Sequence, residues 1–218
     1  MEIPVLFEDR HLIVCVKPAG VLSEDGGMPE LLAAQCGAPR IFCVHRLDKS
    51  VSGVMVYAKD GKTAALLSEA VSSRAVTKEY LAVVQGVPAE ACGTLRDLLY
   101  HDAVKNKTYV VSRPRRGVKE AVLDYVVEAA ACAGEVGEIS LLRITLHTGR
   151  SHQIRAQFAA RKLPLLGDGR YGSAIRSCDI ALQSCRLAFT HPVTGAVLDF
   201  SAPLPDAWPW TLFPPGGC

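Results

Sequence analysis

Apolar and polar residues alternate with a period of two through much of the chain, the pattern of half-buried β-strands. The first two examples are residues 4–8 and 11–17, which the polar pair Asp9-Arg10 separates. The same pattern predicts further strands at residues 41–45, 53–58, 78–85, 94–100, 108–112, 121–128, 138–147, 180–190 and 197–201. No apolar run approaches the roughly 18 residues that a membrane-spanning helix needs, so no membrane partner is expected.

Helical spacing is confined to a few segments. Asp60 is predicted to cap a helix that reaches about residue 74, with Ala64, Leu67 and Val71 on its apolar face. Other helices are predicted at residues 30–36 and 151–162. Because helices and strands do not alternate regularly, the sequence favours an α+β fold with a mixed, largely antiparallel β-sheet over a doubly wound parallel sheet.

The length of 218 residues fits a single domain, 1–218, of two lobes, with residues 86–93 as the candidate boundary between the lobes. The N-terminal segment carries Glu2, Glu8 and Asp9 where a secretory signal would carry Lys or Arg. Eight cysteines lack the C-x-x-C spacing of zinc and redox sites, so reduced thiols in the cytoplasm and no metal are expected.

The net charge of +2 neither demands nor forbids a polyanionic partner, but basic residues are concentrated locally. Residues 102–119 contain six Lys and Arg against one Asp, and residues 143–176 contain seven against one Asp. Such segments fit a surface that binds a nucleic-acid backbone. Lysines that protect an edge strand from aggregation are the alternative reading of residues 105–119.

Residues 45–59 read HRLDKSVSGVMVYAK and place Asp48 in a polar loop between two predicted strands. A carboxylate at the mouth of such a loop is well placed for catalysis. The alternative is that Asp48 only organises the turn through hydrogen bonds to the backbone that follows it.

Residues 146–162 read LHTGRSHQIRAQFAARK and pass from a strand through Gly149 into a helix. Unpaired N–H groups at the helix start attract anions, and Arg150 and His152 lie beside them. Arg150 could instead pair with Asp48, since a nearby guanidinium favours an ionised carboxylate. An inconsequential surface ion pair is the remaining alternative.

In residues 77–86, TKEYLAVVQG, Tyr80 lies in an alternating strand; by itself it reads as a half-buried strand tyrosine. Taken together, however, the motifs resemble those of the RluA-type pseudouridine synthase family. HRLDKSVSG, KEYLAVVQG, TLHTGRSHQIRAQF, LLGDGRYG and AFTHPVTGAVLDFSAPLP occur in the family's order, and FEDRHLIVCVKPAGVLS is similar to its usual start.

The resemblance implies a mixed sheet with flanking helices and a central cleft, and an enzyme of the isomerase class. Asp48 would be the catalytic aspartate, Tyr80 would stack on the target uracil, and Arg150 would pair with Asp48. Arg46 would enter the RNA stack in place of the flipped uridine, and Ile154 would line the wall behind the base. His45, His152 and Arg155 are expected to contact the substrate.

Two departures from the family pattern are visible. Val51 replaces a threonine found in many members, and residues 181–185 lack a histidine often seen there. No S4-like RNA-binding domain precedes the catalytic region, so substrate choice is expected to depend on this domain's own surface. The partner would be ribosomal or transfer RNA, bound by a monomer.

Pseudouridine formation breaks the C1′–N1 bond, rotates the uracil and joins its C5 to C1′, so it needs no cofactor. An ionised Asp48 could act as nucleophile or as base at the sugar, and the residues leave both open. A non-catalytic RNA-binding module on the same scaffold is the alternative function. A metal nuclease is less favoured, because it would need several convergent carboxylates.

Overall fold

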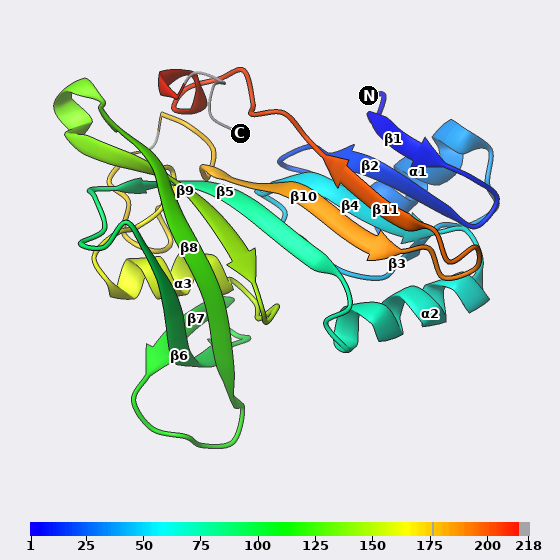
Figure 1. Ribbon diagram of the computed structural model, residues 1–218, viewed down its shortest axis with the longest axis horizontal. Coiled ribbons are helices and arrows are strands. Elements are labelled where there is room, and N and C mark those ends of the chain that lie inside the picture. The colour runs from blue at the N-terminus through cyan, green and yellow to red at the C-terminus, as the bar shows by residue number, and fades with distance from the viewer. Residues whose placement is uncertain (176, 214–218) are drawn as a thin grey trace. The chain divides into compact units, whose positions relative to one another are not determined.

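A computed structural model describes residues 1–175 and 177–213, so Arg176 and Cys218 lie outside the described residues. The chain forms two compact units (Figure 1). Unit 1 comprises Met1–Glu79 and Gln183–Pro203, and unit 2 comprises Tyr80–Leu182 and the segment from Leu204 onward. The predicted boundary at residues 86–93 is wrong, because that segment only turns the chain between two strands of unit 2.

Unit 1 is built on a sheet with the strand order β1-β2-β4-β10, to which β3 adds on β4 and β11 on β10. The pair β4–β10 is parallel, and the pairs β1–β2, β2–β4, β3–β4 and β10–β11 are antiparallel. The elements are β1 (Val5–Glu8), β2 (Leu12–Lys17), α1 (Met28–Cys36), β3 (Phe42–Cys43), β4 (Ser52–Ala58), α2 (Gly61–Ser72), β10 (Leu182–Thr190) and β11 (Val197–Ser201).

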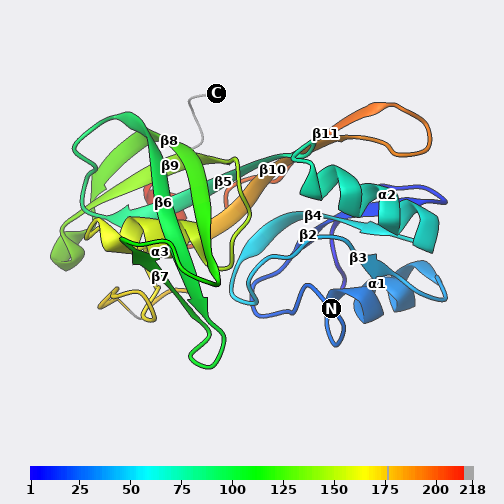
Figure 2. The same cartoon turned by 90° about the horizontal axis from the view of Figure 1, so that it is seen from below.

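The core of unit 1 lies between its sheet and α2. Leu67 of α2 packs with Val14 of β2, Val56 of β4 and Leu187 of β10, all of them buried. Asp60 caps α2 as predicted, because its carboxylate accepts a 2.8 Å hydrogen bond from the Thr63 amide. Helix α1 lies on the other side of the β2–β4 pair (Figure 2). Strand β4 is therefore buried on both faces.

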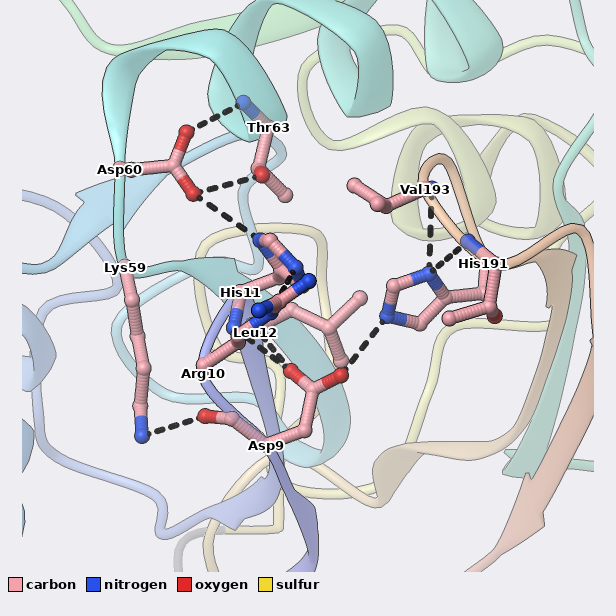
Figure 3. A network of polar contacts seen from close by, with 10 residues as sticks. Asp9, Arg10, His11, Leu12, Lys59, Asp60, Thr63, His191 and Val193 are labelled. Atoms are coloured by element: carbon pink, nitrogen blue, oxygen red, sulfur yellow. Dashed lines mark hydrogen bonds and ion pairs between the residues drawn. The ribbon is translucent and has the colours of Figure 1, made fainter.

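Two turns of unit 1 are joined by a polar network (Figure 3). Asp9 accepts hydrogen bonds from the backbone of His11 and Leu12, at 2.7 and 2.8 Å, and its other oxygen lies 3.0 Å from Nε2 of His191. Nδ1 of His191 accepts the amides of Val193 and Thr194, so Nε2 carries the proton that is donated to Asp9. The network ties the β1–β2 turn to the β10–β11 turn.

Unit 2 contains strands in the order β5-β9-β8-β6-β7, in which the pairs β6–β7, β6–β8 and β8–β9 are antiparallel. The strand pairings confirm the expected mixed, largely antiparallel α+β fold. The elements are β5 (Thr77–Gln85), which begins in unit 1, β6 (Cys92–Asp102), β7 (Lys107–Val111), β8 (Val118–Cys132), the 3-10 helix η1 (Gly134–Val136), β9 (Glu138–Leu146), α3 (Gln153–Ala160) and the 3-10 helix η2 (Trp210–Leu212).

Helix α3 forms the core of unit 2 against this sheet. Its residues 153–158 are all buried, and the ring of Phe158 meets that of Tyr125 edge-on, with centroids 5.7 Å apart. Ala156 packs with Leu99 of β6 and Ala121 of β8. None of the helices in the described residues is long and apolar enough to span a membrane.

Candidate active site

The Asp48 loop is held from both sides by the segment that follows β2. The Ser23 hydroxyl donates a 2.8 Å hydrogen bond to the Leu47 carbonyl and accepts a 3.2 Å bond from the Leu47 amide. The carbonyl of Lys49 accepts from the Gly20 amide at 2.8 Å. Leu47 and Lys49, on either side of Asp48, are therefore fixed, so the Asp48 side chain projects from a rigid stretch of backbone.

Lys17, the last residue of β2, is the buried cation of this loop. Its ammonium donates to the carbonyls of Pro18, Val21 and Lys49 at 2.9, 2.7 and 3.2 Å, and its side chain is fully buried. Burial lowers the pKa of Lys17 to about 8, and the negative charge of Asp48 acts in the opposite direction. Lys17 thus places a positive charge beside Asp48 within unit 1.

His45 is a buried part of the scaffold of the same loop. Its Nε2 accepts a 3.2 Å hydrogen bond from the Val56 amide, so the imidazole takes the place of a strand carbonyl where β3 ends. Burial, and after it the charge of Lys78, lowers the pKa of His45 to about 3. The imidazole of His45 is neutral, is hydrogen-bonded to the Val56 amide and is only 8 % exposed. It is therefore poorly placed for the predicted substrate contact. Arg46 is instead exposed, with Nη1 3.1 Å from a Glu24 oxygen.

In unit 2, the turn before α3 is organised by Gln153, the first residue of the helix. Its buried side-chain oxygen accepts from the Thr148 hydroxyl at 2.8 Å and from the Arg150 amide at 3.0 Å. Its amide nitrogen donates to the Val122 carbonyl at 3.1 Å. Nε of Arg150 donates to the Glu120 carbonyl at 3.0 Å, so the backbone of Arg150 is held by Gln153 and its side chain by β8.

Arg155 is the other arginine of this region, and it is oriented more tightly than Arg150. Its Nε and Nη2 donate to both oxygens of Asp168 at 2.6 and 2.9 Å, and both side chains are almost completely buried. The guanidinium also lies over the ring of Tyr171, 5.0 Å from its centroid. A planar, bidentate pair of this kind fixes the direction of the guanidinium.

His152 precedes α3 with φ of 52°, in the left-handed region that is unusual for a residue other than glycine. Its Nδ1 lies 3.0 Å from the hydroxyl of Tyr171, which itself accepts the Thr108 amide at 2.7 Å. The Tyr171 hydroxyl is thus hydrogen-bonded both to the His152 ring and to the backbone of β7. These bonds hold the strained turn between Arg150 and Arg155.

Tyr80 and Ile154 are both buried, at 7 % and 4 % exposure, as an aromatic platform and an apolar wall would be. Within unit 1 the fold brings His45, Arg46 and Asp48 into one loop. Within unit 2 it brings Arg150, His152, Ile154 and Arg155 to the start of α3. The pairing of Asp48 with Arg150 stays a prediction.

The exposed basic residues predicted from the sequence lie on the β6–β7 hairpin and the turn into β8. Lys105, Arg113, Arg115, Arg116 and Lys119 are exposed and Lys107 is half-buried. Within the described part of the chain, none of these six forms an ion pair. Arg115 lies over the ring of Tyr100 at 4.6 Å, and Lys107 over that of Tyr171 at 5.3 Å. Their charges are free to meet a polyanion.

Sequence reasoning missed Lys17, Ser23, Gln153 and Asp168. The signal for Lys17 was available, because a lysine that ends the apolar run Leu12–Val16 shares the face of Ile13 and Cys15. For Ser23 and Asp168, the partners are brought close only by folding, and Gln153 combines near neighbours in sequence with the distant Val122 carbonyl.

A rigidly held carboxylate loop, together with an exposed basic surface, fits an enzyme that acts on a nucleic acid. Residues 11–160 match the family described as RNA pseudouridylate synthase, and the chain belongs to this family of RNA-modifying isomerases. This assignment confirms the function and enzyme class expected from the sequence motifs.

Curated relatives agree. The chain is 34 % identical over 227 residues to "Ribosomal large subunit pseudouridine synthase D" of Xanthomonas campestris pv. campestris, covering 93 % of this chain and 66 % of that protein. It is 35 % identical over 231 residues to the protein of the same name from Vibrio cholerae, covering 94 % and 68 %. The chain therefore spans about two thirds of the length of these relatives.

Solved structures show the same fold. "Human RNA Pseudouridylate Synthase Domain Containing 1" superposes with a TM-score of 0.79 at 24 % identity, covering 93 % of this chain and 83 % of that chain. "Human RNA Pseudouridylate Synthase Domain Containing 4" gives a TM-score of 0.76, also at 24 % identity, covering 93 % and 89 %.

Proposed function

We propose that this chain converts uridine to pseudouridine in large-subunit ribosomal RNA, with Asp48 as the catalytic carboxylate. The observation that carries the proposal is the fixed Asp48 loop, held at Leu47 and Lys49 with the Lys17 ammonium beside it. The reaction exchanges the C1′–N1 bond for a C1′–C5 bond, while C5 loses a proton and N1 gains one, so it needs one well-placed charge and a pocket for the base. The names of the relatives support the choice of RNA.

The remaining roles follow from the family resemblance and the local environments. Tyr80 stacks on the extruded uracil, a step that costs a few kcal/mol in lost base stacking. Ile154 lines the wall behind the base, and Arg46, which is exposed, enters the RNA stack. His152 and Arg155 lie at the start of the same helix, α3, and contact the substrate from unit 2.

Two arginines compete for the role of partner to Asp48. The sequence favours Arg150, whereas the tight orientation of Arg155 by Asp168 gives Arg155 the more rigid guanidinium. The variants Arg150→Met and Arg155→Met distinguish the two candidates. Loss of the arginine that pairs with Asp48 should lower kcat by orders of magnitude. Loss of the other arginine should chiefly alter RNA affinity or protein stability.

The test is tritium release from RNA transcripts labelled at uracil C5, since joining C5 to C1′ expels the C5 hydrogen. Wild-type protein is expected to release tritium from large-subunit ribosomal RNA and not from transfer RNA. Asp48→Asn should abolish release with an unchanged melting temperature, and Asp25→Asn, a nearby exposed carboxylate, serves as the matched control.

Each outcome decides something. Release from transfer RNA alone overturns the choice of RNA but keeps the catalyst. RNA binding without release by the wild-type protein favours the non-catalytic module instead. Full turnover by Asp48→Asn removes Asp48 from the mechanism.

The cellular setting is also proposed. The seven described cysteines are free thiols, which fits the cytoplasm. We expect a monomer, and light scattering after gel filtration would test this.

A further inference from the structure

Lys78, near the start of β5, is a half-buried cation whose neighbours in sequence do not neutralise it. Residues adjacent in a strand point to opposite faces. Glu79 is engaged on its own face, where an oxygen lies 2.6 Å from Nη1 of Arg186, and Arg186 also pairs with Asp199 at 2.6 Å. Lys78 therefore faces away from this ion-pair group, on the side of β5 that Tyr80 shares.

No hydrogen bond or ion pair reaches Nζ of Lys78 from any residue that the structure describes. Its environment nevertheless removes water from the ammonium, since burial lowers the pKa of Lys78 to about 8. Lys17, the other buried lysine of unit 1, shows how burial of an ammonium is normally compensated. It donates to three carbonyls and is attracted by the charge of Asp48. A desolvated ammonium without such compensation is costly.

The surroundings of Lys78 in unit 1 offer it no acceptor. The nearby titratable group is His45, whose pKa the charge of Lys78 lowers, so the interaction is repulsive for the protonated imidazole. Nε2 of His45 already accepts the Val56 amide, which leaves Nδ1 to carry the proton. His45 belongs to the segment that leads to Asp48, so this cation lies close to the proposed catalytic loop.

We infer that Lys78 binds a phosphate group of the RNA chain next to the uridine that is modified. The inference rests on the proposed function and deepens it. A compact ammonium suits a phosphate oxygen as a point charge, and the substrate brings one such anion with every nucleotide. The RNA thus supplies the counter-charge that the protein lacks at this position.

The experiment compares Lys78→Gln and Lys78→Arg with Lys62→Gln, which removes one exposed lysine from α2 in the same unit. Binding of a large-subunit ribosomal RNA transcript is measured by filter binding over a range of KCl concentrations, in the Asp48→Asn background. Tritium release is measured separately in the otherwise wild-type chain.

Lys78→Gln is expected to raise Kd and KM about tenfold, with kcat within about twofold, because a charge-assisted hydrogen bond is lost. The slope of log Kd against log KCl concentration should fall by about one unit, as for one lost phosphate contact. Lys78→Arg should restore most of the affinity, and Lys62→Gln should match the parent. Melting temperatures check that every variant folds.

Equal Kd, KM and salt slopes for Lys78→Gln and Lys62→Gln would overturn the inference, as would a loss confined to kcat. This result differs from a failure of the proposed function. If the wild-type chain releases no tritium, the function fails, while the salt slopes still decide whether Lys78 meets a phosphate.

Discussion

Nζ of Lys17 donates a 3.2 Å hydrogen bond to the carbonyl of Lys49, the residue that follows Asp48. One buried ammonium therefore both fixes the backbone next to Asp48 and supplies a charge that attracts its carboxylate. This bond joins the end of β2 to the Asp48 loop, some thirty residues away in sequence.

Lys17→Met tests this link. The change removes one hydrogen-bond donor from each of three carbonyls, of which that of Lys49 keeps the Gly20 amide, and it removes the positive charge beside Asp48. We expect kcat for tritium release to fall at least about tenfold, equivalent to 1.4 kcal/mol in the barrier. Lys59→Met is the matched control, since Lys59 pairs with Glu8 at the opposite end of β4 and should retain wild-type kcat. Unchanged kcat in Lys17→Met would separate the lysine from catalysis.

His45 makes stability depend on pH. Its pKa is about 3 in the folded protein and near the ordinary 6.5 when unfolded, so between these values the unfolded chain binds more protons. Stability should therefore fall as pH drops from about 6.5 toward 3, by at most about 1.4 kcal/mol per pH unit from this group. Urea unfolding at pH 7, 6 and 5 measures the slope. His45→Gln keeps an acceptor for Val56 and should flatten it; identical slopes would contradict the assignment.

The buried pair of Arg155 and Asp168 predicts a strong non-additivity. Asp168→Asn removes the negative charge that both Nε and Nη2 of the buried Arg155 guanidinium contact, and it should destabilise the protein by about 3–5 kcal/mol. The double variant Arg155→Met, Asp168→Leu should recover much of this stability, because no buried charge is then left. Chemical unfolding of the single and double variants completes the cycle. Additive losses would mean that the two side chains do not depend on one another.

His191→Phe tests the network that joins the turns of unit 1. The amides of Val193 and Thr194 lose their acceptor and Asp9 loses a donor, so we expect a loss of about 1–3 kcal/mol. Because the network lies at the far end of β2 from Lys17, kcat of the folded enzyme should not change. A melting temperature within about one degree of the wild type would refute the structural role.

Most strands and helices were predictable from the sequence, since period-two alternation and the Asp60 cap are local signals. The strand predicted at residues 41–45 was too long, because the His45 side chain replaces a backbone acceptor of the ladder. The helix predicted from residue 151 begins at Gln153, because His152 adopts a left-handed conformation that Tyr171 stabilises. Both errors arise where a distant partner overrides local preference.

Only part of the candidate site was predictable from the sequence. The order of the motifs pointed to Asp48 and Tyr80, whose roles stay predictions, but a motif does not show which residues hold these side chains in place. Ser23, Lys17 and Asp168 act through groups that lie far away in sequence, so only the folded chain relates them to the loops. Arg155 illustrates the difference, because a sequence shows its charge and not the carboxylate that orients it.

The discontinuity of unit 1 has a consequence for synthesis. Its parallel pair β4–β10 aligns Gly53 with Ser184, and a Cβ at Gly53 would lie 2.2 Å from the Ser184 carbonyl oxygen, so only glycine permits this approach. While the chain emerges from the ribosome, residues 1–79 must wait for about a hundred further residues before β10 can dock. The segment carrying Asp48 is therefore synthesised early, but the sheet that supports it can finish folding only after most of unit 2 has been translated.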